Sequence, residues 1–209
     1  DYIRTVTNFA FGYEWNEGKQ KTHILYPVDI SSIKLDENSL ILDTINFISN
    51  DFIRNSFTDH FITALRYSFI YSDQKLNKKV NFNYFKGNLE IAGNMLRTAN
   101  KLSNSAIDSS DNSYRIFGIK YAQYGKVDID WRHYIFINQH STVVFRIASG
   151  LGLPFGNSTV MPFERSFFAG GTNGIRAWQA RELGPGSYQG PSNYDQIGDI
   201  KIEGNIESR

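Results

Sequence analysis

The sequence predicts an all-β fold, and more specifically part of an antiparallel transmembrane β-barrel. Aromatic residues make up 15% of the 209 residues, which is typical of strands rather than helices. About seven segments of the chain alternate apolar and polar side chains with the period of two that a strand produces. The connections between these segments are alternately short and long, like the turns and loops at the two ends of a membrane barrel.

Composition excludes several other classes. The chain has 22 basic and 21 acidic residues, so its charge does not indicate a nucleic-acid partner. It has no cysteine, which excludes a disulfide framework and thiolate metal sites. We find no signal peptide and no apolar run near the roughly 18 residues of a membrane helix. The chain opens on Asp1 and stops at Arg209 within an alternating segment, so we expect a piece of a longer protein.

The first two strands are predicted as a hairpin. Residues 5–15 alternate cleanly, residues 16–18 (Asn-Glu-Gly) form the tight turn, and residues 19–28 return. We expect sheet pairing to end near Pro27, because proline has no N–H to donate to a neighbouring strand. The apolar face of the first strand is predicted to hold Thr7, Phe9, Phe11, Tyr13 and Trp15.

A long connection is predicted over about residues 29–60. Four apolar residues within it recur at helical spacing, which predicts a short amphipathic helix that packs over the barrel rim. These residues are Ile41, Ile45, Ile48 and Phe52.

The middle of the chain repeats the pattern. Strands are predicted over 61–71 and 80–92, with a short polar turn at 72–79 between them. A second long connection covers 93–113, with a helix near 95–102.

The last third of the chain has three further segments of this kind. Residues 114–137 contain one or two strands, and a turn at 138–141 leads into a strand over 142–153. The third long connection covers 154–197. Residues 198–209 alternate again, with isoleucines on one side and charged residues on the other.

Alternation alone does not distinguish a membrane barrel from a soluble sandwich or barrel, because both have one apolar face. Long connections that all fall at one end favour the membrane barrel, as do strands of about 10 to 13 residues, which suit a tilted span. A soluble lipid- or sugar-binding sandwich is the remaining alternative. It would bury the apolar faces against protein.

The segment from Pro162 to Pro185 reads PFERSFFAGGTNGIRAWQARELGP. Its glycines stand among bulky aromatic residues, whereas a flexible linker is poor in such residues. Phe167, Phe168 and Trp178 need a surface to pack against. We expect Phe168 and Trp178 to pack inside the barrel, and the alternative is a position in the aromatic girdle at the membrane interface. The segment is therefore predicted to be an ordered plug or clasp.

This segment resembles the long barrel loop of the BamA/TamA-type outer-membrane assembly factors, the bacterial surface-antigen superfamily. Members carry Phe-x-x-Gly-Gly, then a Val-Arg-Gly-Phe-like tetrapeptide, then Leu-Gly-Pro. Ala177 replaces the tetrapeptide's glycine, which suggests a divergent, TAM-like lipoprotein branch. The residues of this chain that we assign to the functional loop motif are Phe168, Gly170, Gly171, Ile175, Arg176, Ala177, Trp178, Leu183, Gly184 and Pro185.

The resemblance implies a barrel of about sixteen strands in the bacterial outer membrane, without a cofactor. It implies that the loop folds into the barrel lumen and that Arg176 pairs with an acidic residue of the inner wall. Glu207 matches the family's partner and is preferred, and Glu203 is the second candidate. The implied partners are client outer-membrane proteins, the lipid bilayer and periplasmic or inner-membrane assembly proteins. The implied activity is protein insertion or translocation.

Two other functions fit the same segment: a polypeptide secretion pore of the two-partner type, and a passive porin or surface scaffold. In the simplest alternative, Arg176 is a solvated loop residue without a partner in the barrel wall. The GGTNG run lacks the Lys-Ser/Thr of a phosphate loop. The four scattered histidines form no metal spacing, and Asp128 and Asp130 fit a network of ion pairs with Arg132 better than a catalytic pair. We therefore expect neither a metal site nor enzymatic activity.

Overall fold

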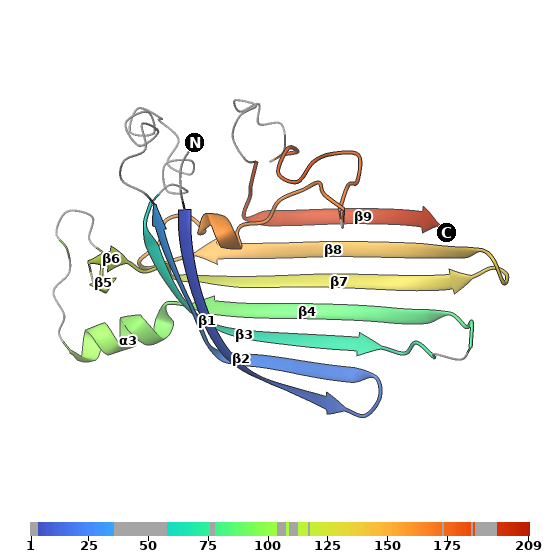
Figure 1. The fold of residues 1–209 in the computed structure, drawn as a ribbon, viewed down its shortest axis with the longest axis horizontal. Coiled ribbons are helices and arrows are strands. Elements are labelled where there is room, and N and C mark those ends of the chain that lie inside the picture. Colours follow the sequence, from blue (N-terminus) through green and yellow to red (C-terminus); the bar gives the residue numbers. More distant parts are fainter. Residues whose placement is uncertain are drawn as a thin grey trace.

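The fold is a single open, antiparallel sheet of seven strands in the order β1-β2-β3-β4-β7-β8-β9 (Figure 1). It is seen in a computed structural model that describes residues 4–35, 58–75, 78–103, 108, 113–116, 118–172, 174–184, 186 and 196–209. Among the described strands the sheet does not close on itself, and β1 and β9 are its two edges. The antiparallel all-β prediction is thus confirmed, while barrel closure is not seen.

The strands are long, and all but the last have 11 to 15 residues. Their bounds are β1 Arg4–Glu17, β2 Lys21–Leu35, β3 His60–Ser72, β4 Phe82–Ala92, β7 Tyr124–Phe136, β8 Thr142–Pro154 and β9 Ile200–Ser208. The smaller elements are α3 Asn94–Leu102, the two-residue strands β5 Arg115–Ile116 and β6 Ile119–Lys120, and the 3-10 turn η1 Phe163–Arg165.

The two faces of the sheet differ in chemistry, as the alternation predicts. Register pairs Lys126 with Gly152 and Asp130 with Ala148 across β7 and β8, so their side chains share one face. We call this the polar face. The opposite, apolar face exposes large hydrophobic side chains on six of the long strands, among them Phe9, Phe11, Leu65, Leu89, Ile129, Ile147 and Ile202.

Pro27 does not end the second strand, contrary to the prediction. Strand β2 continues to Leu35, and Pro27 pairs with neither β1 nor β3. The register of β2 against β3 shifts between Tyr26 and Asp29. This bulge removes the need for an N–H at Pro27, which is the usual way that a sheet accommodates proline.

Figure 1 shows the short turns at one end of the strands, and α3, β5 and β6 at the other. The connection predicted over 29–60 starts later than expected, because β2 continues to Leu35. Helix α3 confirms the helix expected near 95–102. The helix expected within 41–52 lies outside the described residues. None of the described helices has the length and apolar character needed to cross a membrane.

A small buried core lies on the polar face, near the end of the sheet that carries the long connections. Tyr124, Ile62 and Ile33 are almost fully buried there. They cluster with Met161, which follows β8. The connection between β8 and β9 therefore covers the polar face, and it is this connection that forms the candidate site.

Candidate functional site

The connection between β8 and β9 packs onto the polar face because β8 has glycine, with no side chain, at the positions that the connection crosses. A Cβ atom added to Gly150 would lie 2.4 Å from Cζ of Phe167, and one added to Gly152 would lie 3.0 Å from Cε of Met161. Any larger side chain at Gly150 would overlap the Phe167 ring. The Phe167 ring also lies 4.3 Å from the Lys126 ammonium nitrogen, a cation–π contact with β7.

Arg165, in the turn η1, anchors the start of this connection. Its Nη2 donates to Oδ2 of Asp29 at 3.4 Å and to Oγ of Ser31 at 3.3 Å, and its Nε lies 3.5 Å from Oε1 of Glu90. The Arg165 side chain is 17% exposed and that of Asp29 only 4%. Burial opposes the charge, but the carboxylates of Glu90 and Asp29 outweigh it and raise the pKa of the guanidinium above its usual value.

Neighbouring groups complete this anchor. Tyr124 donates its hydroxyl to Oε1 of Glu90 at 2.5 Å, and Lys126 donates to the carbonyl oxygen of Arg165 at 2.7 Å. Arg66 forms a second ion pair with Asp29 at 2.5 Å. The loop arginine thus lies in a polar site built from β2, β3, β4 and β7.

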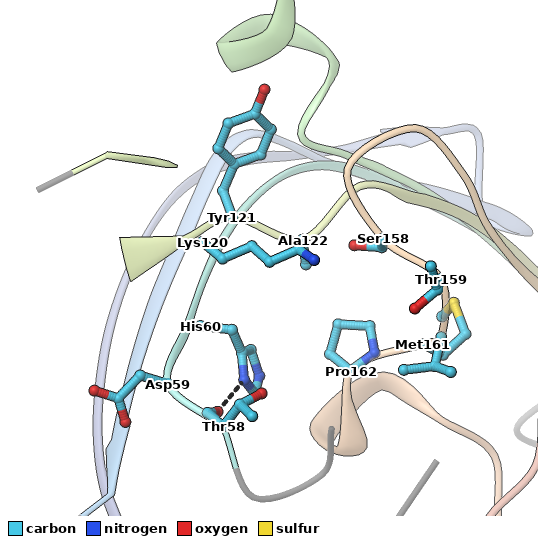
Figure 2. A pocket seen from close by; sticks show the side chains of 11 residues that line it. Thr58, Asp59, His60, Lys120, Tyr121, Ala122, Ser158, Thr159, Met161 and Pro162 are labelled. Carbon is cyan, nitrogen blue, oxygen red and sulfur yellow. Dashed lines mark hydrogen bonds between the residues drawn. The ribbon is translucent and has the colours of Figure 1, made fainter. Parts of the chain in front are cut away.

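A histidine contact holds the residue before Arg165. The Nδ1 atom of His60 lies 2.8 Å from the carbonyl oxygen of Thr58, and its Nε2 lies 2.8 Å from Oε2 of Glu164. His60, Met161 and Pro162 line a pocket of about 60 Å³, and Figure 2 shows how these side chains lie. The first residue of β3 is therefore joined to the start of the loop.

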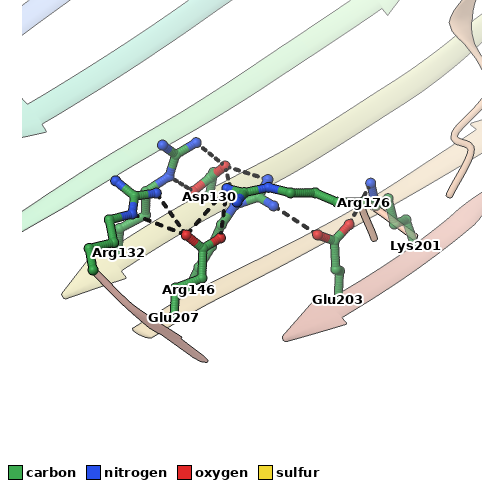
Figure 3. A network of polar contacts seen from close by, with 8 residues as sticks. Asp130, Arg132, Arg146, Arg176, Lys201, Glu203 and Glu207 are labelled. Carbon is green, nitrogen blue, oxygen red and sulfur yellow. Dashed lines mark hydrogen bonds and ion pairs between the residues drawn. The ribbon is translucent and has the colours of Figure 1, made fainter. Parts of the chain in front are cut away.

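Arg176 makes the second long-range contact. Its Nη2 lies 3.0 Å from Oε1 and 3.2 Å from Oε2 of Glu207 on β9 (Figure 3). Glu207 also accepts hydrogen bonds from Nε and Nη2 of Arg209, at 3.1 and 2.9 Å. Glu203 does not contact Arg176; it accepts from Nη1 of Arg146 at 2.8 Å and pairs with Lys201. Whether the Arg176–Glu207 contact locks the loop functionally stays a prediction.

Between the two contacts the chain folds tightly on itself. The amide of Gly171 donates to the carbonyl of Trp178 at 2.9 Å, and Ala169 bridges Leu183. Gly170 has a φ of 88° and would bring any Cβ to 2.1 Å from the carbonyl oxygen of Gln179. Glycine is therefore required at this position for steric reasons.

The signature residues are not all packed as expected. Trp178 is 49% exposed and Phe168 is 40% exposed, whereas Phe167 carries the main contact with the sheet. Ile175, Ala177 and Trp178 form the exposed tip of the loop together with Arg176. Leu183 and Gly184 lie where the chain returns, and Pro185 lies outside the described residues.

Sequence reasoning missed Arg165, Glu164 and the close approach of the Phe167 ring to Gly150 on β8. A usable signal existed, because Glu164 and Arg165 are two charged residues that stand shortly after Pro162 among aromatic residues. Carboxylates on the polar face of predicted strands, such as Glu90, were their available partners. No group of three or more metal-ligating side chains occurs within the part of the chain that the structure describes.

The comparison with protein families supports the architecture. The model of the Omp85 superfamily domain matches residues 7–209, which is nearly the whole chain. No curated protein matches the sequence.

Proposed function

The chain belongs to the Omp85 superfamily, whose members are bacterial outer-membrane proteins for protein insertion or secretion. On that premise we propose that the chain is part of an outer-membrane assembly or translocation factor. The working element is the loop 162–185, held inside the barrel. Because Ala177 replaces the tetrapeptide's glycine, we place the chain in a TAM-like branch.

The main support is that charged side chains hold the loop at two points, one near its start and one near its tip. Arg165 contacts β2 and β4 near the start, and Arg176 contacts β9 near the tip. Arg176 reaches both carboxylate oxygens of Glu207 through Nη2 alone, and an ion pair of this kind gains strength where water is scarce. In a closed barrel the polar face would line the lumen, so the two arginines would hold the loop within it.

The exposed apolar face supports a lipid environment. Ile200, Ile202 and Ile206 on β9 are 67%, 81% and 74% exposed. Exposed large hydrophobic side chains recur on six of the long strands, and such exposure is costly in water and favourable in a bilayer. The free backbone edges of β1 and β9 are costly in lipid, so we propose that further strands close the barrel around this sheet.

The proposed partners are client outer-membrane proteins and periplasmic or inner-membrane assembly proteins. Depletion of the parent protein, followed by quantitative proteomics of the outer membrane, tests this proposal. A broad loss of other barrel proteins supports assembly. Loss of one secreted protein alone identifies a secretion pore of the two-partner type. An unchanged outer membrane overturns the proposal and leaves a passive porin or scaffold.

A further inference from the structure

A second polar pocket lies where the tip of the loop meets β7, β8 and β9. Its volume is about 70 Å³, and its lining includes four arginines but a single carboxylate, that of Glu207. Figure 3 shows the charged network around it. The arginines are Arg132, Arg146, Arg176 and Arg209.

Cations outnumber carboxylates in this network. Each of its three carboxylates is already shared by two cations. Asp130 forms ion pairs with Arg132 and Arg146, Glu203 with Arg146 and Lys201, and Glu207 with Arg176 and Arg209. Five cationic side chains thus face three carboxylates, and the pocket is left with a positive charge that no described side chain neutralises.

Two of the arginines keep donors that face no acceptor among the described residues. Arg176 uses only Nη2, so its Nε and Nη1 hydrogens remain available. Arg209 uses Nε and Nη2, so Nη1 remains available. The hydroxyl of Thr172 also lines the pocket. Residues with hydrogen-bond donors from the loop and from the end of β9 therefore line one small pocket.

We propose that this pocket binds a phosphate-type oxyanion, a function that does not depend on the assembly role. A volume of about 70 Å³ has room for several water molecules, and hence for a tetrahedral oxyanion. Guanidinium groups match phosphate oxygens in pairs, with charge-assisted hydrogen bonds. Because Arg176 comes from the loop and Arg209 follows β9, the anion bridges the two.

Calorimetric titration of inorganic phosphate into the full chain, folded in uncharged detergent micelles at low salt, tests the proposal. We expect saturable binding at one site, which weakens as salt is added. Arg209→Gln should weaken it at least about tenfold, since it removes one charge-assisted partner. Arg209 is 55% exposed, so its loss should not unfold the protein.

Arg115→Gln is the matched control, because Arg115 carries the same charge at the opposite end of the strands (Figure 1). It should leave phosphate binding unchanged. Absence of saturable binding overturns the proposal, as does an equal loss in both variants, which would indicate attraction by net charge alone.

The source of the oxyanion is tested by adding phosphatidylglycerol to the micelles. If this lipid competes with inorganic phosphate, the ligand is a lipid headgroup; if it does not, the ligand is a soluble phosphate. Either result supports the phosphate chemistry.

Discussion

Replacement of Arg165 by glutamine should release the loop from the sheet. The change keeps a polar side chain, shorter and uncharged, and leaves Asp29, whose side chain is 4% exposed, with one cationic partner fewer. Glu90 would keep the hydrogen bond from Tyr124 but lose its cation in η1. Removing one partner of a buried ion pair costs about 3–5 kcal/mol. The contacts of Arg165 are 3.3 to 3.5 Å long, so we expect the lower end, about 3 kcal/mol.

A cost of about 3 kcal/mol corresponds to roughly a hundredfold larger population of undocked loop. The chain has no cysteine, so the thiol introduced by Ser166→Cys can report this population without background. Ser166 is 7% exposed, and its maleimide labelling should follow loop opening. Arg165→Gln should speed labelling by about a hundredfold.

Arg115→Gln again serves as control, because its ion pair with Asp108 is well exposed and is worth at most about 1 kcal/mol. Equal labelling rates in Arg165→Gln and the parent protein would refute the anchoring argument.

Three further predictions concern the loop and the apolar face. Gly150→Val should displace the Phe167 ring and destabilise loop docking by about 1–3 kcal/mol, which raises the rate of maleimide labelling at Ser166→Cys. Gly204→Val is the control and should leave this rate unchanged, because a Cβ added at Gly204 meets nothing within 4 Å. Equal effects of the two variants would contradict the steric argument. Glu207→Gln should speed tryptic cleavage within the loop several-fold, because the amide holds a guanidinium less tightly than the carboxylate does, and unchanged cleavage would count against the pairing. Ile129→Arg should lower folding into lipid vesicles by about 2–4 kcal/mol, as expected for a charge at mid-bilayer on the lipid-facing side; folding yields equal to the parent's on gel mobility would argue against a lipid-facing sheet.

The strands could be predicted from the sequence because each carries its own signal. In β7, Val127, Ile129 and Trp131 alternate with charged residues, and the sheet places them on the apolar face as the period requires. Pro27 shows the limit of such reasoning. Its missing donor does forbid pairing, but a local bulge satisfies that condition without ending the strand.

The loop contacts were harder to predict from the sequence, because they join distant parts of the chain. Arg165 and Asp29 are separated by 136 positions, and no local pattern connects them. Glu203 and Glu207 lie on the same face of β9, so periodicity could not rank them as partners of Arg176. The resemblance favoured Glu207, and in the structure Arg146 and Lys201 already occupy Glu203.

The most direct test of the account measures the outer-membrane proteome of depleted cells that express the Arg176→Ala variant of the full-length parent. Arg115→Ala, expressed to the same level, is the control for loss of one arginine. The account predicts that the control restores the other outer-membrane proteins and that Arg176→Ala does not. Restoration by both variants would contradict the claim that a loop held by Arg176 is needed for assembly.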